Sequence, residues 1–256
     1  MGYTMTKERM DEIFAALSET YRIYAPVKRG KFIRYGEVKS VEQVVWNEKS
    51  HFSPKEVFYP IVQTLLYFSE NDVRESEGDH KPAIILLRPC DINGIHRLDT
   101  VFMENGGHAD NYYQRLREKV KFFLMECPES FETCFCVSMG SNVTDDYSVA
   151  LRVNDDGVFV EVKDGAFADI FGGEAACDFT PAFVPENQRK VNVPEITDRR
   201  FVKDIHALDM WREFDDNCIG CGGCNTVCIT CSCFDTTDII YNETSRDGER
   251  RRVWSS

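Results

Sequence analysis

Apolar residues recur at every third or fourth position in two stretches near the ends of the chain, which is the spacing of an amphipathic helix. The first set is Met10, Ile13, Phe14, Leu17 and Tyr21. With Thr6 as its cap, this set predicts a helix over residues 6–20. The second set is Ile205, Leu208, Trp211 and Phe214. It predicts a helix that leads the chain to Cys218.

Another helix is predicted to begin at Ser53-Pro54-Lys55-Glu56. This tetrapeptide combines a capping box with proline at the first helical position. Pro60 must then kink or end the helix, because proline removes a backbone donor. Ile61, Leu65 and Phe68 would continue it on one face.

Two pairs of strands follow the pattern of hairpins. Residues 21–27 and 31–38 form the first predicted pair, and residues 147–153 and 158–162 form the second. The second pair alternates apolar and polar positions around Asn154-Asp155-Asp156-Gly157, which is the clearest turn signal in the chain.

Between the hairpins lies a strand, helix, strand pattern. Residues 83–87 are a continuous apolar run, as expected of a strand buried on both faces, and residues 120–125 form another apolar strand. Helical spacing marks residues 91–102 and 112–119 between them. Because parallel strands need a crossover of this length, we expect the two runs to be parallel neighbours.

These elements predict an α/β fold with a mixed sheet in the N-terminal domain and a partial bacterial-ferredoxin-like module at the C-terminus. We expect the α/β domain to cover residues 1–179 and the module to cover residues 204–256. Residues 180–203 turn polar and contain three prolines, which is typical of a linker.

The charge and the cysteine content narrow the function. A net charge of −13 over 256 residues argues against nucleic acid or an anionic membrane surface as partner. Neither a signal peptide nor a membrane-length apolar run is present, so we expect a cytoplasmic protein. Eleven Cys in a reducing compartment are metal or cluster ligands more often than disulfides, and only Cys177 lacks an obvious place.

The most specific motif is the run of Cys218, Cys221, Cys224 and Cys228. Three thiols two residues apart and a fourth after three more match the ligand run of bacterial ferredoxins, which bind [4Fe–4S] clusters. Glycines within the run let a short loop bring its amides toward the sulfides. A structural zinc site is the alternative, although zinc ribbons space their Cys pairs much more widely.

The run departs from the ferredoxin pattern in two ways. Ile229 stands where proline usually follows the fourth Cys. In addition, the fourth Cys of such a run usually serves a second cluster, and no second run follows before Ser256. Cys231 and Cys233 are spare ligand candidates, and we expect that the chain is truncated.

A second thiol group emerges from the fold prediction. If the two apolar strands are parallel neighbours, Cys90 and Cys127 leave the sheet at the same carboxyl edge, where open α/β sheets place ligands. Cys134 and Cys136 follow a short loop later. We therefore expect a further [4Fe–4S] cluster at these four residues, with Arg88 raising its potential. Buried apolar cysteines and a zinc site are the alternatives.

Other signals are weak. His96 follows Cys90 on the same predicted helix, and we interpret it as partly buried packing. Arg250-Arg251-Arg252 is a solvated face or, less often, a docking patch. No dinucleotide-binding or phosphate loop and no catalytic triad stands out, so no catalytic residue is assigned.

Taken together, the motifs resemble those of the iron–sulfur electron-transfer subunit of anaerobic sulfite reductase. Over the earlier half they also resemble the iron–sulfur subunits of sulfhydrogenase-type hydrogenases. The similarity covers nearly the whole chain in the same order. The segments that carry it are 53–60, 88–91, 98–102, 112–113, 134–140, 218–234 and 248–254.

The resemblance implies an electron-transfer subunit without a substrate bond of its own to make or break. It would pass electrons from a flavin subunit that oxidises NADH, or from a ferredoxin, to a sirohaem subunit that reduces sulfite to sulfide. Members of the family carry a second ferredoxin run beyond the position of Ser256. The alternatives are the corresponding subunit of a soluble hydrogenase and a zinc-stabilised interaction protein.

Overall fold

Four strands rich in apolar residues form the parallel centre of the main sheet. The computed structural model describes residues 1–76, 81–194, 199–244 and 246–255. Its central strands are β2 (Arg22–Arg29), β6 (Ala83–Leu87), β7 (Val120–Met125) and β8 (Val149–Asn154). β6 pairs in parallel with β2 and with β7, and β7 pairs in parallel with β8. The predicted parallel strand, helix, strand unit is therefore confirmed.

Antiparallel strands extend this centre on both sides. They are β1 (Gly2–Met5), β3 (Phe32–Glu37), β9 (Gly157–Val162) and β10 (Ala175–Cys177). Among the described residues the sheet has eight strands in the order β10-β1-β9-β8-β7-β6-β2-β3. Both predicted hairpins are present, as β2–β3 and β8–β9. Cys177, which had no obvious place in the sequence pattern, pairs with Gly2 on the edge strand β10.

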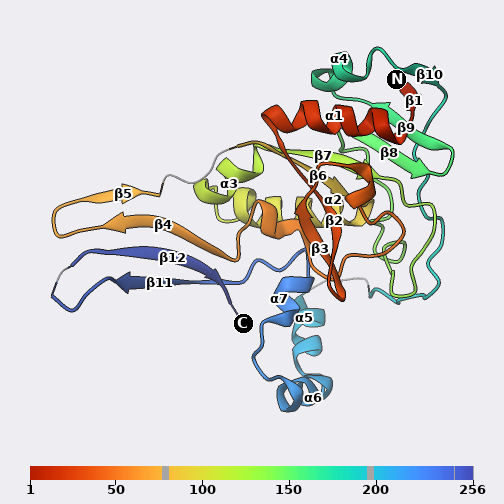
Figure 1. The fold of residues 1–256 in the computed structure, drawn as a ribbon. Helices are drawn as coiled ribbons and strands as arrows, with labels where there is room; N and C mark the ends of the chain where they lie inside the picture. Colours follow the sequence, from red (N-terminus) through yellow and green to blue (C-terminus); the bar gives the residue numbers. More distant parts are fainter. Residues whose placement is uncertain (77–80, 195–198, 245, 256) are drawn as a thin grey trace.

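Helices cover both faces of the sheet, as Figure 1 shows. α1 (Lys7–Thr20), capped by Thr6 as predicted, packs on one face near the short α4 (Ala168–Phe171). α2 (Pro89–Asp99), its π-helical continuation to Glu104, and α3 (Asn111–Arg117) pack on the other face. Alternate residues of the buried strand β6 enter these two cores, which explains its unbroken apolar run.

A second sheet contradicts one of the predicted helices. Only the short 3-10 helix Pro54–Val57 follows the capping box at Ser53, whose hydroxyl accepts from the amide of Lys55. Ile61, Leu65 and Phe68 were expected to continue it as a helix, but the chain instead forms β4 (Val62–Phe68). The prediction was wrong because the partner of this strand, β12 (Gly248–Trp254), lies far away in the sequence.

The complete second sheet has the order β11-β12-β4-β5 within the described residues. β5 (Val73–Glu75) and β11 (Phe234–Ile240) are its edges, and the two hairpins lie side by side in Figure 1. Trp254, at the end of β12, is buried in the same core as α2 and α3. The division into units at residues 179 and 204 stays a prediction, and the C-terminal strands pair with a strand from the first of those units.

The segment before the cysteine run contains two helices where the sequence predicted one. α5 (Arg199–His206) and α6 (Met210–Asn217) are separated by a turn at Leu208, and α7 (Gly223–Val227) lies within the run. Residues 195–198 of the predicted linker lie outside the described residues, and residues 199–203 belong to α5. None of the described helices is long and apolar enough to cross a membrane.

Candidate iron–sulfur sites

The parallel strands bring four cysteines to one edge of the main sheet, and we call Cys90, Cys127, Cys134 and Cys136 the sheet-edge thiols. Cys90 lies in the first turn of α2, directly after β6, and Cys127 follows β7. The backbone of Cys127 is held by Ala182, which accepts from its amide at 3.3 Å. Because β6 and β7 are parallel neighbours, both thiols leave the sheet at its carboxyl end.

The sheet-edge thiols influence one another electrostatically. Burial raises the pKa of Cys90 well above its ordinary value, and the nearby Asp91, Cys136, Cys127 and Cys134 add to this rise. Burial also raises the pKa of Cys127, which is only 8% exposed. Cys134 and Cys136 therefore lie near enough to Cys90 and Cys127 to influence the pKa of both thiols.

A buried cation accompanies these thiols. Arg88 is 8% exposed, and its guanidinium donates to the carbonyl oxygens of Trp46 at 2.6 Å and Glu48 at 3.3 Å. By its charge and by a hydrogen bond, Arg88 partly offsets the rise in the pKa of Cys127. A positive charge and an N–H donor at the thiols match the needs of an anionic cluster.

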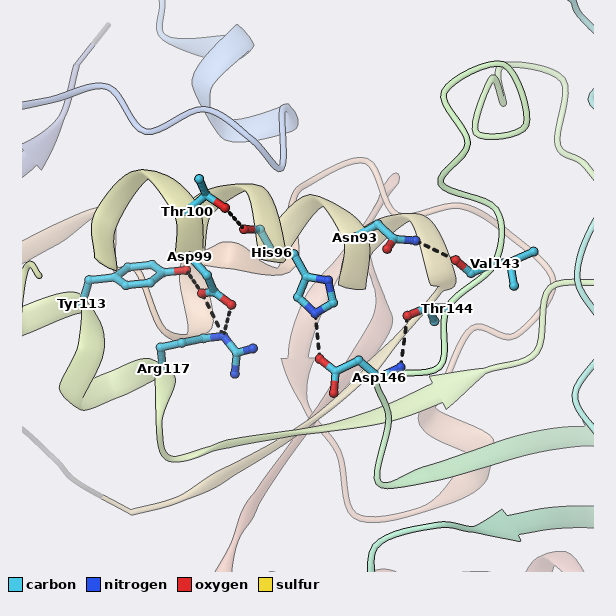
Figure 2. Close-up of polar contacts among 9 residues, drawn as sticks. All are labelled: Asn93, His96, Asp99, Thr100, Tyr113, Arg117, Val143, Thr144 and Asp146. Atoms are coloured by element: carbon cyan, nitrogen blue, oxygen red, sulfur yellow. Dashed lines mark hydrogen bonds and ion pairs between the residues drawn. The ribbon is translucent and has the colours of Figure 1, made fainter. Parts of the chain in front are cut away.

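The loop that carries Cys134 and Cys136 is fastened at two points. Asn187 is 7% exposed, accepts from the amide of Val137 at 2.7 Å, and donates to Sγ of Cys136 at 3.4 Å. On the other side, the amide of Asn93 donates to the carbonyl oxygens of Ser141 and Val143. Since Asn93 lies on α2, this contact ties the loop to the helix of Cys90 (Figure 2).

Two further polar side chains on α2, His96 and Asp99, contact neighbouring segments. His96 was interpreted as packing, and its Nε2 forms a 2.7 Å contact with Asp146, a residue of the loop before β8 (Figure 2). Asp99 accepts from the hydroxyl of Tyr113 and from the guanidinium of Arg117, both on α3. These contacts tie α2 to α3 and to the segment before β8.

The C-terminal cysteine run is built differently, and we call Cys218, Cys221, Cys224 and Cys228 the run thiols. All four are exposed. The backbone of Cys218 ends α6, and α7 lies between Cys221 and Cys228. Gly220 and Gly222 have φ angles of +64° and +68°, a conformation that favours glycine and lets the chain turn between the thiols.

Cys231 and Cys233, the spare ligand candidates, lie directly after the run. Cys231 is half-buried and Cys233 is exposed. A hydrogen bond with Cys231 raises the pKa of Cys233, so the two thiols are neighbours, and Cys224 is close enough to add to the rise. The spare thiols therefore lie beside the run.

Sequence reasoning missed the platform on which the run rests. Lys55 is 0% exposed, and its Nζ donates to Oδ1 of Asn225 at 2.9 Å and to the carbonyl oxygen of Cys231 at 2.7 Å. Asn225, in α7, donates in turn to the carbonyl oxygens of Cys233 and Ser255. The only sequence signal was the capped turn around Lys55, which equally predicts the start of a helix.

A tight contact connects the two thiol groups. A Cβ at Gly94 would lie 2.4 Å from Cγ2 of Ile229, so only glycine allows this approach. Gly94 lies about one helical turn, or about 6 Å, after Cys90 on α2, and Ile229 directly follows Cys228. Isoleucine at the position usually held by proline thus serves as the contact between the run and the main domain.

Comparison with known proteins agrees with this geometry. Residues 217–256 match the model of the 4Fe-4S dicluster domain. The chain is 30% identical over 244 residues to the sulfhydrogenase 2 subunit beta of Pyrococcus furiosus. That alignment covers 90% of this chain and 72% of the relative. The chain belongs to the sulfhydrogenase beta-subunit family. No solved structure is significantly similar to it.

As a member of the sulfhydrogenase beta-subunit family, the protein is an iron–sulfur electron-transfer subunit with [4Fe–4S] clusters as its cofactor. The predicted fold class is confirmed, since a mixed α/β domain with a large mixed sheet is followed by a ferredoxin-like dicluster domain. The more specific identification as a sulfite reductase subunit is not shown by these similarities.

The donor set in this sulfhydrogenase-type subunit suits clusters. In the part of the chain that the structure describes, no three His, Cys, Asp or Glu side chains are grouped to bind one metal ion. A zinc ion needs all its ligands within about 2.3 Å of one centre, whereas the four thiolates of a [4Fe–4S] cluster bind different irons and stay farther apart. Cysteine thiols with N–H donors at Cys127 and Cys136 are the kind of ligand that a [4Fe–4S] cluster takes.

Proposed function

We propose that this subunit relays electrons between clusters held by the run thiols and by the sheet-edge thiols. The observation that carries the proposal is the packing of Ile229 against Gly94, because it joins the segment after Cys228 to the helix that contains Cys90. When bound, the clusters supply one-electron redox chemistry. The chain contributes ligands, N–H donors, burial and charge, and it makes or breaks no substrate bond.

At the C-terminus, Cys218, Cys221 and Cys224 would hold three irons of one cluster. In dicluster ferredoxins the fourth Cys of a run serves the other cluster, which assigns this role to Cys228. The geometry that supports the assignment is the pair of left-handed glycines, because they turn the chain between successive thiols. Cys231 and Cys233 are close enough to act as alternative ligands.

At the sheet edge, Cys90, Cys127, Cys134 and Cys136 would hold a further [4Fe–4S] cluster. Support comes from the mutual influence of the four thiols and from two N–H donors, Arg88 at Cys127 and Asn187 at Cys136. Hydrogen bonds to sulfur and a nearby cation both favour the reduced cluster and raise its potential.

The complex that the protein serves is best assigned to the sulfhydrogenase type, because the similar Pyrococcus furiosus protein is a sulfhydrogenase subunit. An anaerobic sulfite reductase is the second candidate, in which the donor is a flavin subunit that oxidises NADH and the acceptor is a sirohaem subunit. The extension from Cys228 to Phe234 and the arginine-rich strand β12 favour that candidate.

Two observations support a cytoplasmic subunit of a larger assembly. All eleven cysteines lie in the described residues, and each is a free thiol, as expected in a reducing compartment. Exposed apolar side chains gather on and before α6, and they are Leu208, Met210, Trp211 and Phe214. Apolar surface of this kind marks protein contacts, and we assign it to a partner subunit.

Iron analysis tests the clusters. We expect the anaerobically purified protein to be brown and to contain iron and acid-labile sulfide. Cys90→Ser and Cys127→Ser should each remove the iron of the sheet-edge site and leave that of the run, whereas Cys177→Ser is the matched control. Unchanged iron in the first two variants would contradict the sheet-edge site, and a colourless zinc protein would contradict the whole proposal.

The complex is tested by anaerobic isolation of the tagged protein from its own cells. Co-purification of hydrogenase subunits, with hydrogen-dependent dye reduction, is the expected result. Recovery of a sirohaem protein, with sulfite-dependent oxidation of reduced dye, would instead establish the second candidate.

A further inference from the structure

Lys55 is a fully buried cation that the relay does not require as a ligand. Its backbone is fixed by the turn that Ser53 caps, and its side chain is 0% exposed. Burying an ammonium group is costly unless it is hydrogen-bonded and compensated by negative charge. The groups that surround the ammonium group therefore indicate the role of its charge.

Direct contacts satisfy part of its hydrogen-bonding capacity. Two acceptors, Oδ1 of Asn225 and the carbonyl oxygen of Cys231, lie within 2.9 Å of Nζ. The ammonium also lies 4.2 Å from the ring centroid of Trp254, a cation–π contact. Both acceptors are neutral oxygens, so neither of them compensates the charge of the ammonium group.

The contacts of Nζ place the ammonium group beside the cysteine-rich segment. One acceptor, Asn225, directly follows Cys224, and the other is the backbone of Cys231. Asn225 also donates to the carbonyl oxygen of Cys233. The charge of Lys55 therefore lies against the segment that contains the last two run thiols and both spare thiols.

We propose that Lys55 acts as a buried positive charge that raises the reduction potential of the [4Fe–4S] cluster that Cys218, Cys221 and Cys224 would hold. Reduction adds one electron, and hence one negative charge, to the cluster. A cation fixed nearby in a medium of low dielectric stabilises the reduced form more than the oxidised form. The inference rests on the proposed ligand assignment at the C-terminus.

The side chain also has a structural role, since it joins the turn at Ser53 to α7. The backbone amide of Ser53 donates to the carbonyl oxygen of Thr226 at 3.0 Å. The hydroxyl of Tyr59 donates to the carbonyl oxygen of Ser232 at 3.3 Å. These contacts hold the same segments without Lys55. A test must therefore measure a quantity that depends on charge and not on attachment alone.

The experiment is an anaerobic redox titration of the reduced-cluster signal by electron paramagnetic resonance, in a Cys90→Ser background that removes the sheet-edge signal. Lys55→Met keeps the apolar stem and removes the charge. We expect its one-electron reduction equilibrium constant to fall at least about tenfold, which is about 59 mV. Lys55→Arg should remain near the starting protein.

A second variant keeps Lys55 and cancels its charge. Asn225→Asp places a carboxylate at the position that now accepts from Nζ, and we expect the potential to fall as in Lys55→Met. The matched control is Lys163→Met. Like Lys55, Lys163 places its ammonium group over an aromatic ring, that of Tyr147. The backbone amide of Lys163 donates to the carbonyl oxygen of Ser148, which lies at the end of the parallel strands opposite to Cys127.

Iron content separates the outcomes of this experiment. Iron bound at the run with an unchanged potential in both Lys55→Met and Asn225→Asp would overturn the role of Lys55 and leave the relay intact. No iron at the run in the starting protein would instead contradict the proposed ligands. If Lys55→Met loses its cluster, Asn225→Asp decides the question, because its lysine still connects the two segments.

Discussion

The two thiol groups of this protein are assembled by opposite means. The sheet-edge thiols come from three separate segments, and parallel strands with a crossover helix bring them together. The run thiols lie within eleven consecutive residues, and glycines with positive φ shape the loop that holds them. In the first group Cys127 is buried and the other three thiols are half-buried, whereas all four thiols of the second group are exposed.

The two groups differ in the support that their ligands receive from the apolar core. The strands that precede Cys90 and Cys127 are buried by apolar side chains on both faces. The run has little apolar support of its own, and it rests on Lys55, Gly94 and the strand β12. We therefore expect the run to lose order first when the clusters are removed.

The largest expected effect concerns Arg252, which ties β12 to the main domain. It is 2% exposed, pairs with Asp110 at 2.6 Å, and donates to Gln63 at 2.7 Å. Arg252→Ala should cost about 3–5 kcal/mol of unfolding free energy, because it leaves a carboxylate without its partner. Urea unfolding measures this.

The control for that variant lies two residues earlier. Arg250 makes a bidentate contact with Asp238, but both side chains are close to half exposed. Arg250→Ala should cost no more than about 1 kcal/mol. Equal losses for the two variants would contradict the view that β12 is part of the main core.

Arg88 should have the next largest effect. Arg88→Met leaves the carbonyl oxygens of Trp46 and Glu48 without their donor and removes the cation beside Cys127. We expect the free energy of unfolding to fall by about 2–4 kcal/mol. We also expect a lower reduction potential for the sheet-edge cluster, measured by redox titration. Arg189→Met, which breaks an exposed ion pair with Glu132, should change neither quantity.

Gly94 tests the contact between the two regions. Gly94→Ala forces Ile229 to move, since the new Cβ would overlap its side chain. The free energy of unfolding should fall by about 1–2 kcal/mol, because the cost of overpacking exceeds the gain in helix propensity from glycine to alanine. Ile229→Ala in the same chain should restore the contact, and a double-mutant cycle without coupling would show that the two residues do not touch.

An effect of similar size is expected at Asn187, which fastens the loop of Cys136. Asn187→Ala removes the acceptor for the amide of Val137 and the donor at Sγ of Cys136. We expect the free energy of unfolding to fall by about 1–2 kcal/mol and the reduction potential of the sheet-edge cluster to be lower. Glu186→Ala, at an exposed neighbouring position, is the control, and a similar loss there would refute a specific role for Asn187.

Much of the main domain was predictable because its signals are local or periodic. The apolar stretches at 83–87 and 120–125 have the pattern of strands buried on two faces, and the length of the crossover between them predicted a parallel pair. That inference placed Cys90 and Cys127 at one edge. Cys134 and Cys136 were predicted to lie at the same edge because they follow Cys127 by only a short loop.

The second sheet was not predictable in this way. β4 was taken for a helix because apolar spacing over a few residues fits either structure, and its partner β12 lies about 180 positions later. The arginine-rich stretch was expected to be a solvated face or a docking patch. In the structure β12 pairs with β4, and Arg252 is almost fully buried, whereas the side chains of Arg250 and Arg251 remain partly exposed.

The sequence by itself determined the chemistry of this protein, since cysteine spacing fixes which thiols a short loop brings together. It also determined the parallel centre of the sheet, through the length and apolarity of its runs. Only the tertiary structure decided the rest: the seating of Lys55 beneath the run, the contact of Gly94 with Ile229, and the pairing of β12 with β4. These features join residues that are far apart in the chain. Such contacts depend on the shape of the assembled core, which the local sequence pattern does not predict.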